Sequence, residues 1–469
     1  MKSNHKDNKD LHRHHHHHGH NDKDHHRKDK MELDKGSKSH NHRRKDKEKE
    51  RNGSRSRGKS KDEERRRRKT KTASPSSPAL LPLQVDWARE LPNYPVASLP
   101  EKAPVVWEME SEGGEQDFVV EGLGGGASCA CTSTYPTLPN GEKDGDPIAD
   151  YPMMLCYSNR VVVALADGCN WGIRSAQAAR SAILAFKQYL HQRQGDVATL
   201  RDAARLLQRA FFEANRKIME GKESAWEAGT TTLLGGLLLQ FKAEEEEEEG
   251  GGHDSTTESR PSWGFLCCNV GDCKAYHFSM ADKSITDITD NNRVNISDAR
   301  DPGGRLGPYL DEGLPDLRNF KLYFLPCAPQ DLLLIVSDGK VHDNFDPRML
   351  GKMPRDIGIA ADQWDLSYSD VEAERAKNKY RNAVLKRLLC KRSESLAPAH
   401  ITKTLIEYCF EATQVCREWM EQHPNQRQPD DYQQFPGKMD HTTCICFVVG
   451  RMVNEEEEGE EEESSSDSS

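Results

Sequence analysis

Short apolar runs and amphipathic helical stripes alternate along the middle of the chain. Runs of strand length are expected at residues 118–120, 160–166, 231–240, 263–270, 274–277, 331–337 and 444–449. Residues 173–191 and 198–220 instead repeat apolar side chains at spacings of three and four, which is typical of helices that bury one face. Two further helical regions are expected at residues 367–389 and 400–421. The order of strands, a helix pair, more strands and a second helix pair predicts an α+β fold with helices on the outer faces of packed sheets.

The apolar pattern covers only part of the chain. Hydrophobic residues make up 35% of the 469 positions, below the ~45–50% of a typical globular protein, so part of the chain is expected to lack a core. Residues 1–73 carry 26 Lys and Arg against 13 Asp and Glu, and the last fifteen residues carry nine acids and no base. Such segments bury too little apolar surface to offset the entropy lost on ordering, so both tails are expected to be disordered.

These composition changes predict a domain organisation. The predicted parts are a disordered basic His/Lys/Arg-rich tail and linker at residues 1–79, an N-terminal extension at residues 80–124, a folded domain at residues 125–453 and a disordered acidic tail at residues 454–469. Six consecutive glutamates at residues 244–249 mark an acidic insert, residues 243–261, within the domain. Because the insert lies between two expected strands, it is predicted to be a solvated hairpin loop.

Several features bear on the cellular location. No apolar run approaches the ~18 residues of a membrane span, and the charged N-terminus shows no secretory signal. The thirteen cysteines form no Cys-x-x-Cys pair, and some alternate along apolar runs as half-buried strand residues would, for example Cys129 with Cys131 and Cys444 with Cys446. A reducing compartment is therefore expected, and hence an intracellular location, cytoplasmic or nuclear.

The basic tail admits two interpretations. The cation cluster at residues 65–69 would suit a nuclear import signal or weak, non-specific contact with nucleic acid. A solubilising tail, half neutralised by its own acids, would have the same composition. The remainder of the chain is acidic, so nucleic-acid binding is not expected outside this tail.

Candidate chemistry lies at the ends of the expected strands. Asp167 and Asp338 each end an apolar run and are followed by Gly, Asp272 follows a run through Gly271, and Asp440 stands just before the last run. Four carboxylates brought together would repel one another unless a cation compensates them. A site made of oxygen ligands suits Mg²⁺ or Mn²⁺. Two such ions can share a water, lower its pKa and direct it at a phosphate ester.

The order of these motifs resembles that of the metal-dependent protein phosphatases, the protein phosphatase 2C family, over residues 125–450. In that family an early Asp is followed by strand motifs Asp-Gly, Gly-Thr-Thr, Asn-Val-Gly-Asp and Ser-Asp-Gly and by a late Asp-Asn-x-Thr. The counterparts here are Asp150, Asp167-Gly168, Gly229-Thr230-Thr231, Asn269-Val270-Gly271-Asp272, Ser337-Asp338-Gly339 and Asp440-His441-Thr442-Thr443. The resemblance implies a central β-sandwich of two mainly antiparallel sheets flanked by helix pairs.

The resemblance also implies a role for each matched residue. The implied ligands of two or three Mg²⁺ or Mn²⁺ ions are Asp167, the carbonyl of Gly168, Asp272, Asp338 and Asp440. Asp167 would bridge two ions, Asp338 and Asp440 would complete the first site, and Asp272 would bind a third, weaker ion. Asp150 would orient the water bound to the metals.

The chain departs from the family pattern at the residues that handle the phosphate and the proton. The family's His after Asp-Gly is replaced by Cys169-Asn170, its early Glu by Ala149 and its phosphate-clamping Arg by Gly145. In the family, Ser-Asp-Gly is followed by a Trp-Asp pair. Here it is followed by Lys340-Val341-His342-Asp343, so the acid comes one residue later. The residues that could substitute are His342 as a proton donor and Arg305 and Lys340 as phosphate ligands. A surface His in a turn is the alternative for His342.

Three functions follow. The first is a metal-dependent phosphoserine and phosphothreonine protein phosphatase that uses a metal-bound water, with a phosphoprotein substrate. The second is a catalytically impaired pseudophosphatase that acts as a metal-stabilised binding module. The third, supported only by the basic tail, is a nucleic-acid-associated protein. A monomer without membrane contact is expected.

Overall fold

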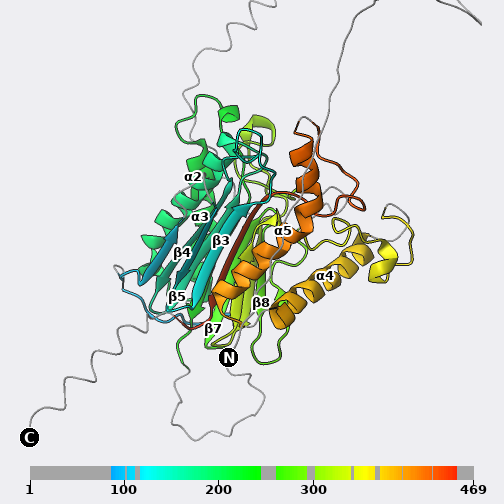
Figure 1. Ribbon diagram of the computed structural model, residues 1–469. Coiled ribbons are helices and arrows are strands. Elements are labelled where there is room, and N and C mark those ends of the chain that lie inside the picture. The colour runs from blue at the N-terminus through cyan, green and yellow to red at the C-terminus, as the bar shows by residue number, and fades with distance from the viewer. Residues whose placement is uncertain are drawn as a thin grey trace, which may run out of the picture. The chain divides into compact units, whose positions relative to one another are not determined.

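Two six-stranded antiparallel sheets form the centre of the folded part of the chain (Figure 1). The first sheet contains, in spatial order, β1 (Trp107–Glu110), β4 (Asp150–Tyr157), β5 (Arg160–Asp167), β6 (Leu233–Gln240), β7 (Trp263–Val270) and β10 (Lys321–Cys327). The second contains β2 (Phe118–Gly122), β3 (Ala127–Ser133), β12 (His441–Val448), β11 (Leu332–Val336), β8 (Lys274–Phe278) and β9 (Ile285–Asp287). The long helices are α2 (Ile173–His191), α3 (Leu200–Met219), α4 (Asp370–Arg387) and α5 (Pro398–Gln422).

The computed structural model describes residues 86–100, 103–110, 117–243, 260–292, 301–339, 343–364, 370–392, 395–424 and 426–451. The chain divides into two units, Met1–Ser74 and Pro75–Ser469, and every described residue belongs to the second. Both charged tails, the six glutamates of the acidic insert and the candidates Lys340 and His342 lie outside the described residues.

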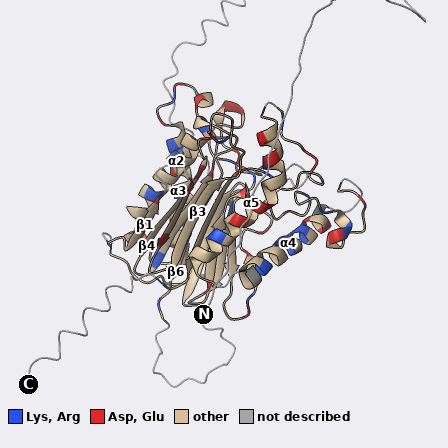
Figure 2. Ribbon diagram, viewed as in Figure 1, with Lys and Arg blue, Asp and Glu red and all other residues tan. Residues whose placement is uncertain are grey.

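Three buried apolar clusters separate four layers. The cluster between the two sheets includes Val163 of β5 and Ile445 of β12. A second cluster, which includes Phe186 of α2, fills the space between the first sheet and helices α2 and α3. A third joins Leu334 of β11 to Leu385 of α4 and to α5. The predicted α+β sandwich flanked by helix pairs is therefore confirmed, and in Figure 2 the charged segments lie mainly on helices and loops, whereas the strands are largely uncharged.

The four predicted helices are present, and their observed ends differ from the predicted ends by three residues or fewer. Helix α3 begins after Thr199, whose hydroxyl accepts a hydrogen bond from the backbone N–H of Asp202. The Asp202 carboxylate accepts a hydrogen bond from the Thr199 N–H in return. This reciprocal capping satisfies two backbone donors and places the helix start at Leu200, two residues later than the apolar pattern alone suggests.

Strands β3 and β12 are buried on both faces. The alternating cysteines of these strands were expected to be half-buried, and this expectation was wrong. Cys129 faces the cluster between the sheets, and Cys444 and Cys446 face the cluster beneath α5. All thirteen cysteines lie in described residues and are free thiols, so the absence of a disulfide framework agrees with the sequence.

The N-terminal extension contributes to both sheets. Strand β1 pairs with β4, and β2 pairs with β3. The ring of Trp87 packs at 5.4 Å from that of Phe320. The acidic insert lies in the sequence between β6 and β7, which pair antiparallel. Among the described residues, no helix is long and apolar enough to cross a membrane.

Candidate metal centre

Carboxylates from both sheets gather at one end of the sandwich. Asp150 is the first residue of β4 and lies opposite Asp167, the last residue of β5. Asp338 follows β11, and Asp440 precedes β12, the neighbouring strand. The cavity at this end has a volume of about 900 Å³, and its walls include Asp167, Gly168, Asp272, Asp338, Asp440 and Arg305. The structure thus brings together at one cavity every predicted metal ligand and one predicted phosphate ligand.

The Gly-Thr-Thr motif holds the Asp-Gly turn in place. The carbonyl of Asp167 accepts hydrogen bonds from the Thr231 hydroxyl at 2.9 Å and from the Thr232 N–H at 2.8 Å. The Thr232 hydroxyl accepts a hydrogen bond from the Asp167 N–H at 3.1 Å. A side chain at Gly168 would place its Cβ 2.6 Å from the carbonyl oxygen of Ser175, so only glycine fits here. Gly168 itself lies in the wall of the cavity.

The turn that presents Asp272 is fixed in the same way. Gly271 has a φ of +105°, which favours glycine, and a Cβ there would lie 2.5 Å from the Thr232 side chain. Its N–H donates to the side chain of Asn319 at 3.1 Å, and its carbonyl accepts from Asn269 at 2.7 Å. The Asn-Val-Gly-Asp motif is therefore a buried, hydrogen-bonded turn, which leaves Asp272 in the cavity wall.

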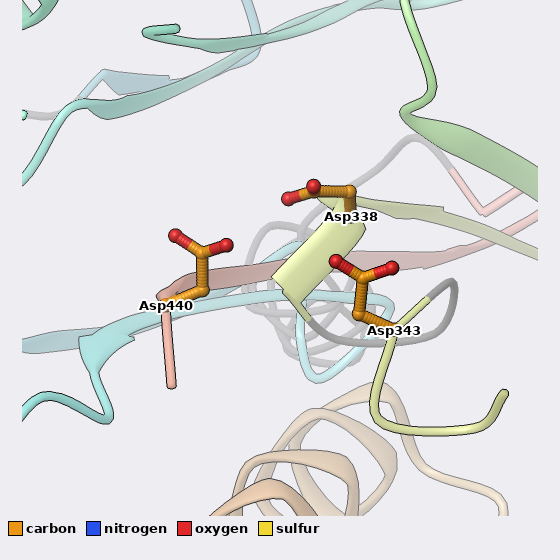
Figure 3. Close-up of side chains that lie close together, drawn as sticks. All are labelled: Asp338, Asp343 and Asp440. Atoms are coloured by element: carbon orange, nitrogen blue, oxygen red, sulfur yellow. The ribbon is translucent and has the colours of Figure 1, made fainter. Parts of the chain in front are cut away.

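Three carboxylates form the tightest part of the centre (Figure 3). One oxygen from each of Asp338, Asp343 and Asp440 lies within 4.8 Å of the others. Asp343 is the acid that the sequence places one residue later than the family pattern. The Asp343 N–H donates a hydrogen bond of 3.0 Å to the Asp338 carbonyl, which holds Asp343 beside Asp338. The displaced acid therefore joins the same cluster, a role that its spacing alone did not reveal.

Lys438 lies at the centre of this cluster and was not a candidate from the sequence. Its Nζ is 2.6 Å from Asp343, 2.9 Å from Asp440 and 3.3 Å from Asp338. Burial lowers the pKa of Lys438, but the three carboxylates outweigh burial and hold the pKa well above its ordinary value. The side chain is therefore an ammonium that neutralises part of the charge.

Asp150 lies behind the cavity wall. Its carboxylate accepts a hydrogen bond of 2.7 Å from the Thr443 hydroxyl. Burial, with smaller contributions from Asp440 and Asp338, raises the pKa of Asp150 to about 7. Burial and the neighbours Asp338, Asp150 and Asp440 likewise raise the pKa of Asp167. Burial is the largest contribution in both cases, and the neighbouring carboxylates add to it.

Two aromatic residues that the sequence did not indicate position Asp440. The Tyr135 hydroxyl donates to the Asp440 carboxylate at 3.2 Å, and the Trp171 indole donates to the Tyr135 oxygen at 2.8 Å. Trp171 stands two residues after Cys169, in the segment that departs from the family pattern. Trp171 is 56% exposed and lines the cavity, so it forms part of the cavity rim.

Arg305 reaches the cavity from the glycine-containing segment after β9. The neighbouring Leu306 pairs with Thr231 through two backbone hydrogen bonds, which fixes the segment beside the Gly-Thr-Thr strand. The guanidinium lies 4.2 Å from the centre of the Tyr309 ring. Its Nε is buried and has no hydrogen-bond partner in the described part of the chain. Arg305 is therefore a cation in the wall of the cavity.

Comparison with known proteins supports the resemblance drawn from the motifs. The chain is 31% identical over 214 residues to the PP2C-like domain-containing protein CG9801 of Drosophila melanogaster. The match covers 45% of this chain and 28% of that protein, so the chain spans well under half of its relative's length. No protein-family model matches the chain. The similarity to a protein named for its PP2C-like domain agrees with the resemblance drawn from the motifs.

Solved structures of phosphatases are also similar, at low identity. The serine/threonine phosphatase of S. agalactiae has 12% identity and a TM-score of 0.39, over 69% of this chain and 99% of that chain. The Mycobacterium tuberculosis serine/threonine phosphatase PstP/Ppp has 15% identity and a TM-score of 0.36, over 69% and 98% of the two chains. The pairing of the strands in two six-stranded sheets establishes the fold of this chain.

Proposed function

We propose that the chain is a metal-dependent phosphatase that acts on phosphoserine and phosphothreonine in proteins. The observation that carries the proposal is the meeting of Asp167, Asp272, Asp338 and Asp440 with Arg305 at one cavity. A set of carboxylate and carbonyl oxygens fits Mg²⁺ or Mn²⁺, and its mutual repulsion calls for cations. When bound, such ions polarise a phosphate ester and lower the pKa of a water.

Residues of the chain would hold the cations and orient the water. Asp167 and the Gly168 carbonyl would hold a cation from the first sheet, and Asp338 and Asp440 from the second. Asp272 would hold a further cation in the same cavity. Because Asp150 lies behind Asp167, it would orient the water through the first layer of carboxylates.

Arg305 would bind the phosphate. Its place in the cavity wall would allow charge-assisted hydrogen bonds from the guanidinium to phosphate oxygens. The stacking on Tyr309 orients the planar guanidinium. Lys340 stays a candidate for the same role, since it lies outside the described residues.

Protonation of the leaving group is the weakest part of the chemistry. Cys169 lines the cavity where the family pattern has a His, and burial raises the pKa of its thiol to about 11. The thiol keeps its proton at neutral pH but is a weak acid. General acid catalysis typically contributes about 10²–10⁴-fold, so turnover should be slow on alkyl phosphates such as phosphothreonine. His342 stays a candidate donor and lies outside the described residues.

The test is hydrolysis of a phosphothreonine peptide by the full chain with Mn²⁺ or with EDTA. Turnover should require Mn²⁺ and should be lost in Asp338→Asn. Asp282→Asn, which changes an exposed acid between β8 and β9, is the matched control and should retain turnover. A folded chain that binds Mn²⁺ but shows no turnover would contradict the proposal and favour a binding module.

A further inference from the structure

We infer that the ammonium of Lys438 takes the place of one divalent cation in this centre, so that the chain's own lysine competes with metal. The inference rests on the proposed function, because it concerns the same carboxylates. It assigns to Lys438 a role that none of the matched motifs contains.

The geometry matches three donors to three acceptors. The ammonium carries three N–H groups, and one oxygen from each of Asp343, Asp440 and Asp338 lies 2.6, 2.9 and 3.3 Å from Nζ. Carboxylate oxygens ligate Mg²⁺ at about 2.0–2.1 Å, so an ion at the centre of the same three oxygens would occupy the position of Nζ. The ammonium and the ion therefore exclude each other.

The backbone of Lys438 is held independently of the carboxylates. Its N–H donates to the side-chain oxygen of Asn344 at 2.9 Å, and its carbonyl accepts from the Asn344 side-chain nitrogen at 3.0 Å. Asn344 is fully buried and directly follows Asp343 in the chain. Two consecutive residues thus contact Lys438: Asp343 binds its ammonium, and the Asn344 side chain holds its backbone through two hydrogen bonds. The position of Lys438 is therefore fixed by more than its ion pairs.

The negative charge that remains on the carboxylates allows a metal ion to compete with the ammonium. One ammonium offsets one of the three carboxylates that it contacts, so negative charge remains in the cluster. A divalent ion is therefore still attracted to the centre. The Lys438 side chain is 20% exposed and lines the cavity, so it has space into which an arriving ion can displace it.

The experiment is a calorimetric titration of the metal-free full chain with Mn²⁺. In Lys438→Met, Mn²⁺ should bind at least about tenfold more tightly than in the unmodified chain, because no tethered cation has to be displaced. Lys438→Arg keeps the charge and should show no such gain. Lys187→Met is the matched control, since Lys187 also bridges two acids, Glu108 and Glu110, but lies outside the cavity.

A second readout covers the case in which the neutral variant loses stability. In EDTA, Lys438→Met should unfold at a lower temperature than the unmodified chain, because three carboxylates lose their cation, and Mn²⁺ should restore the loss. Equal Mn²⁺ affinity in both proteins, or a variant that Mn²⁺ does not restore, would overturn the inference. Neither readout requires turnover, so an inactive chain with a clear gain in Mn²⁺ affinity would overturn the proposed function but leave the role of Lys438 standing.

Discussion

Asp150 and Asp167 lie directly opposite each other where β4 and β5 begin and end, one behind the cavity wall and one in it. Antiparallel pairing puts the start of one strand beside the end of the next, so two acids 17 positions apart become neighbours. The two have different surroundings. Asp150 accepts a hydrogen bond from Thr443, whereas Asp167 faces the other carboxylates. This pairing predicts separable effects of substitution.

Asp150→Asn should reduce turnover without reducing stability. Asn has nearly the same shape and removes a buried charge, and burial already raises the pKa of Asp150 to about 7. We expect an unchanged or higher Tm and an about 10–100-fold lower kcat/KM, the usual effect of losing a residue that orients a metal ligand or its water. Calorimetry and peptide hydrolysis measure the two quantities. A fall in Tm of several degrees would show that Asp150 serves the fold instead.

Tyr135→Phe should weaken metal binding. The substitution removes the hydroxyl that donates to Asp440 and accepts from Trp171, so Asp440 loses one of the groups that orient it. We expect Mn²⁺ affinity to fall about tenfold and the free energy of unfolding to fall by about 1 kcal/mol. Tyr157→Phe, which removes a hydroxyl bonded to His191 at 2.8 Å, is the control and should leave Mn²⁺ affinity unchanged. Equal effects of both substitutions on Mn²⁺ affinity would argue against a positioning role.

Arg305→Met should weaken phosphate binding more than metal binding. Hydrogen bonds to charged groups contribute about 1.5–3 kcal/mol, so the inhibition constant of inorganic phosphate should rise about 10–100-fold. Arg305→Lys should recover part of the loss, because it keeps the charge but not the planar fork. Mn²⁺ affinity, measured by calorimetry, should stay within about twofold in both variants. An unchanged inhibition constant for phosphate in Arg305→Met would exclude Arg305 as the phosphate ligand.

Much of the candidate centre could be predicted because its acids are covalent neighbours of strands. An apolar run fixes a strand, and the next residue must emerge at its end, so Asp167 and Asp338 were placed by local pattern. Lys438 could not be found in this way. It contacts Asp343 across 95 positions of sequence, and only the pairing of β11 with β12 brings the two segments together.

Two of the strands that are absent from the predicted runs, β4 and β10, contain a proline. Pro152 argues against a strand, yet it lies in β4, at the position where the pairing with β1 has already ended at Met153. Its missing N–H therefore leaves no gap in the described pairing. Pro326 is tolerated in β10 because that strand is at the edge of its sheet. Both assignments require the neighbouring strands to be known, and sequence periodicity does not supply them.

The packing of α2 on the first sheet gives a test of the fold itself. Gly235 of β6 faces Phe186 of α2, and a Cβ at this position would lie 2.4 Å from the ring. Gly235→Ala should therefore destabilise the chain by about 1–3 kcal/mol, the usual cost of overpacking a core. Adding Phe186→Leu should recover part of this loss, because the smaller side chain frees the space that the methyl group needs. Denaturant unfolding of both single variants and the double variant measures the coupling. Strictly additive effects of the two substitutions would show that the helix does not approach the sheet at Gly235.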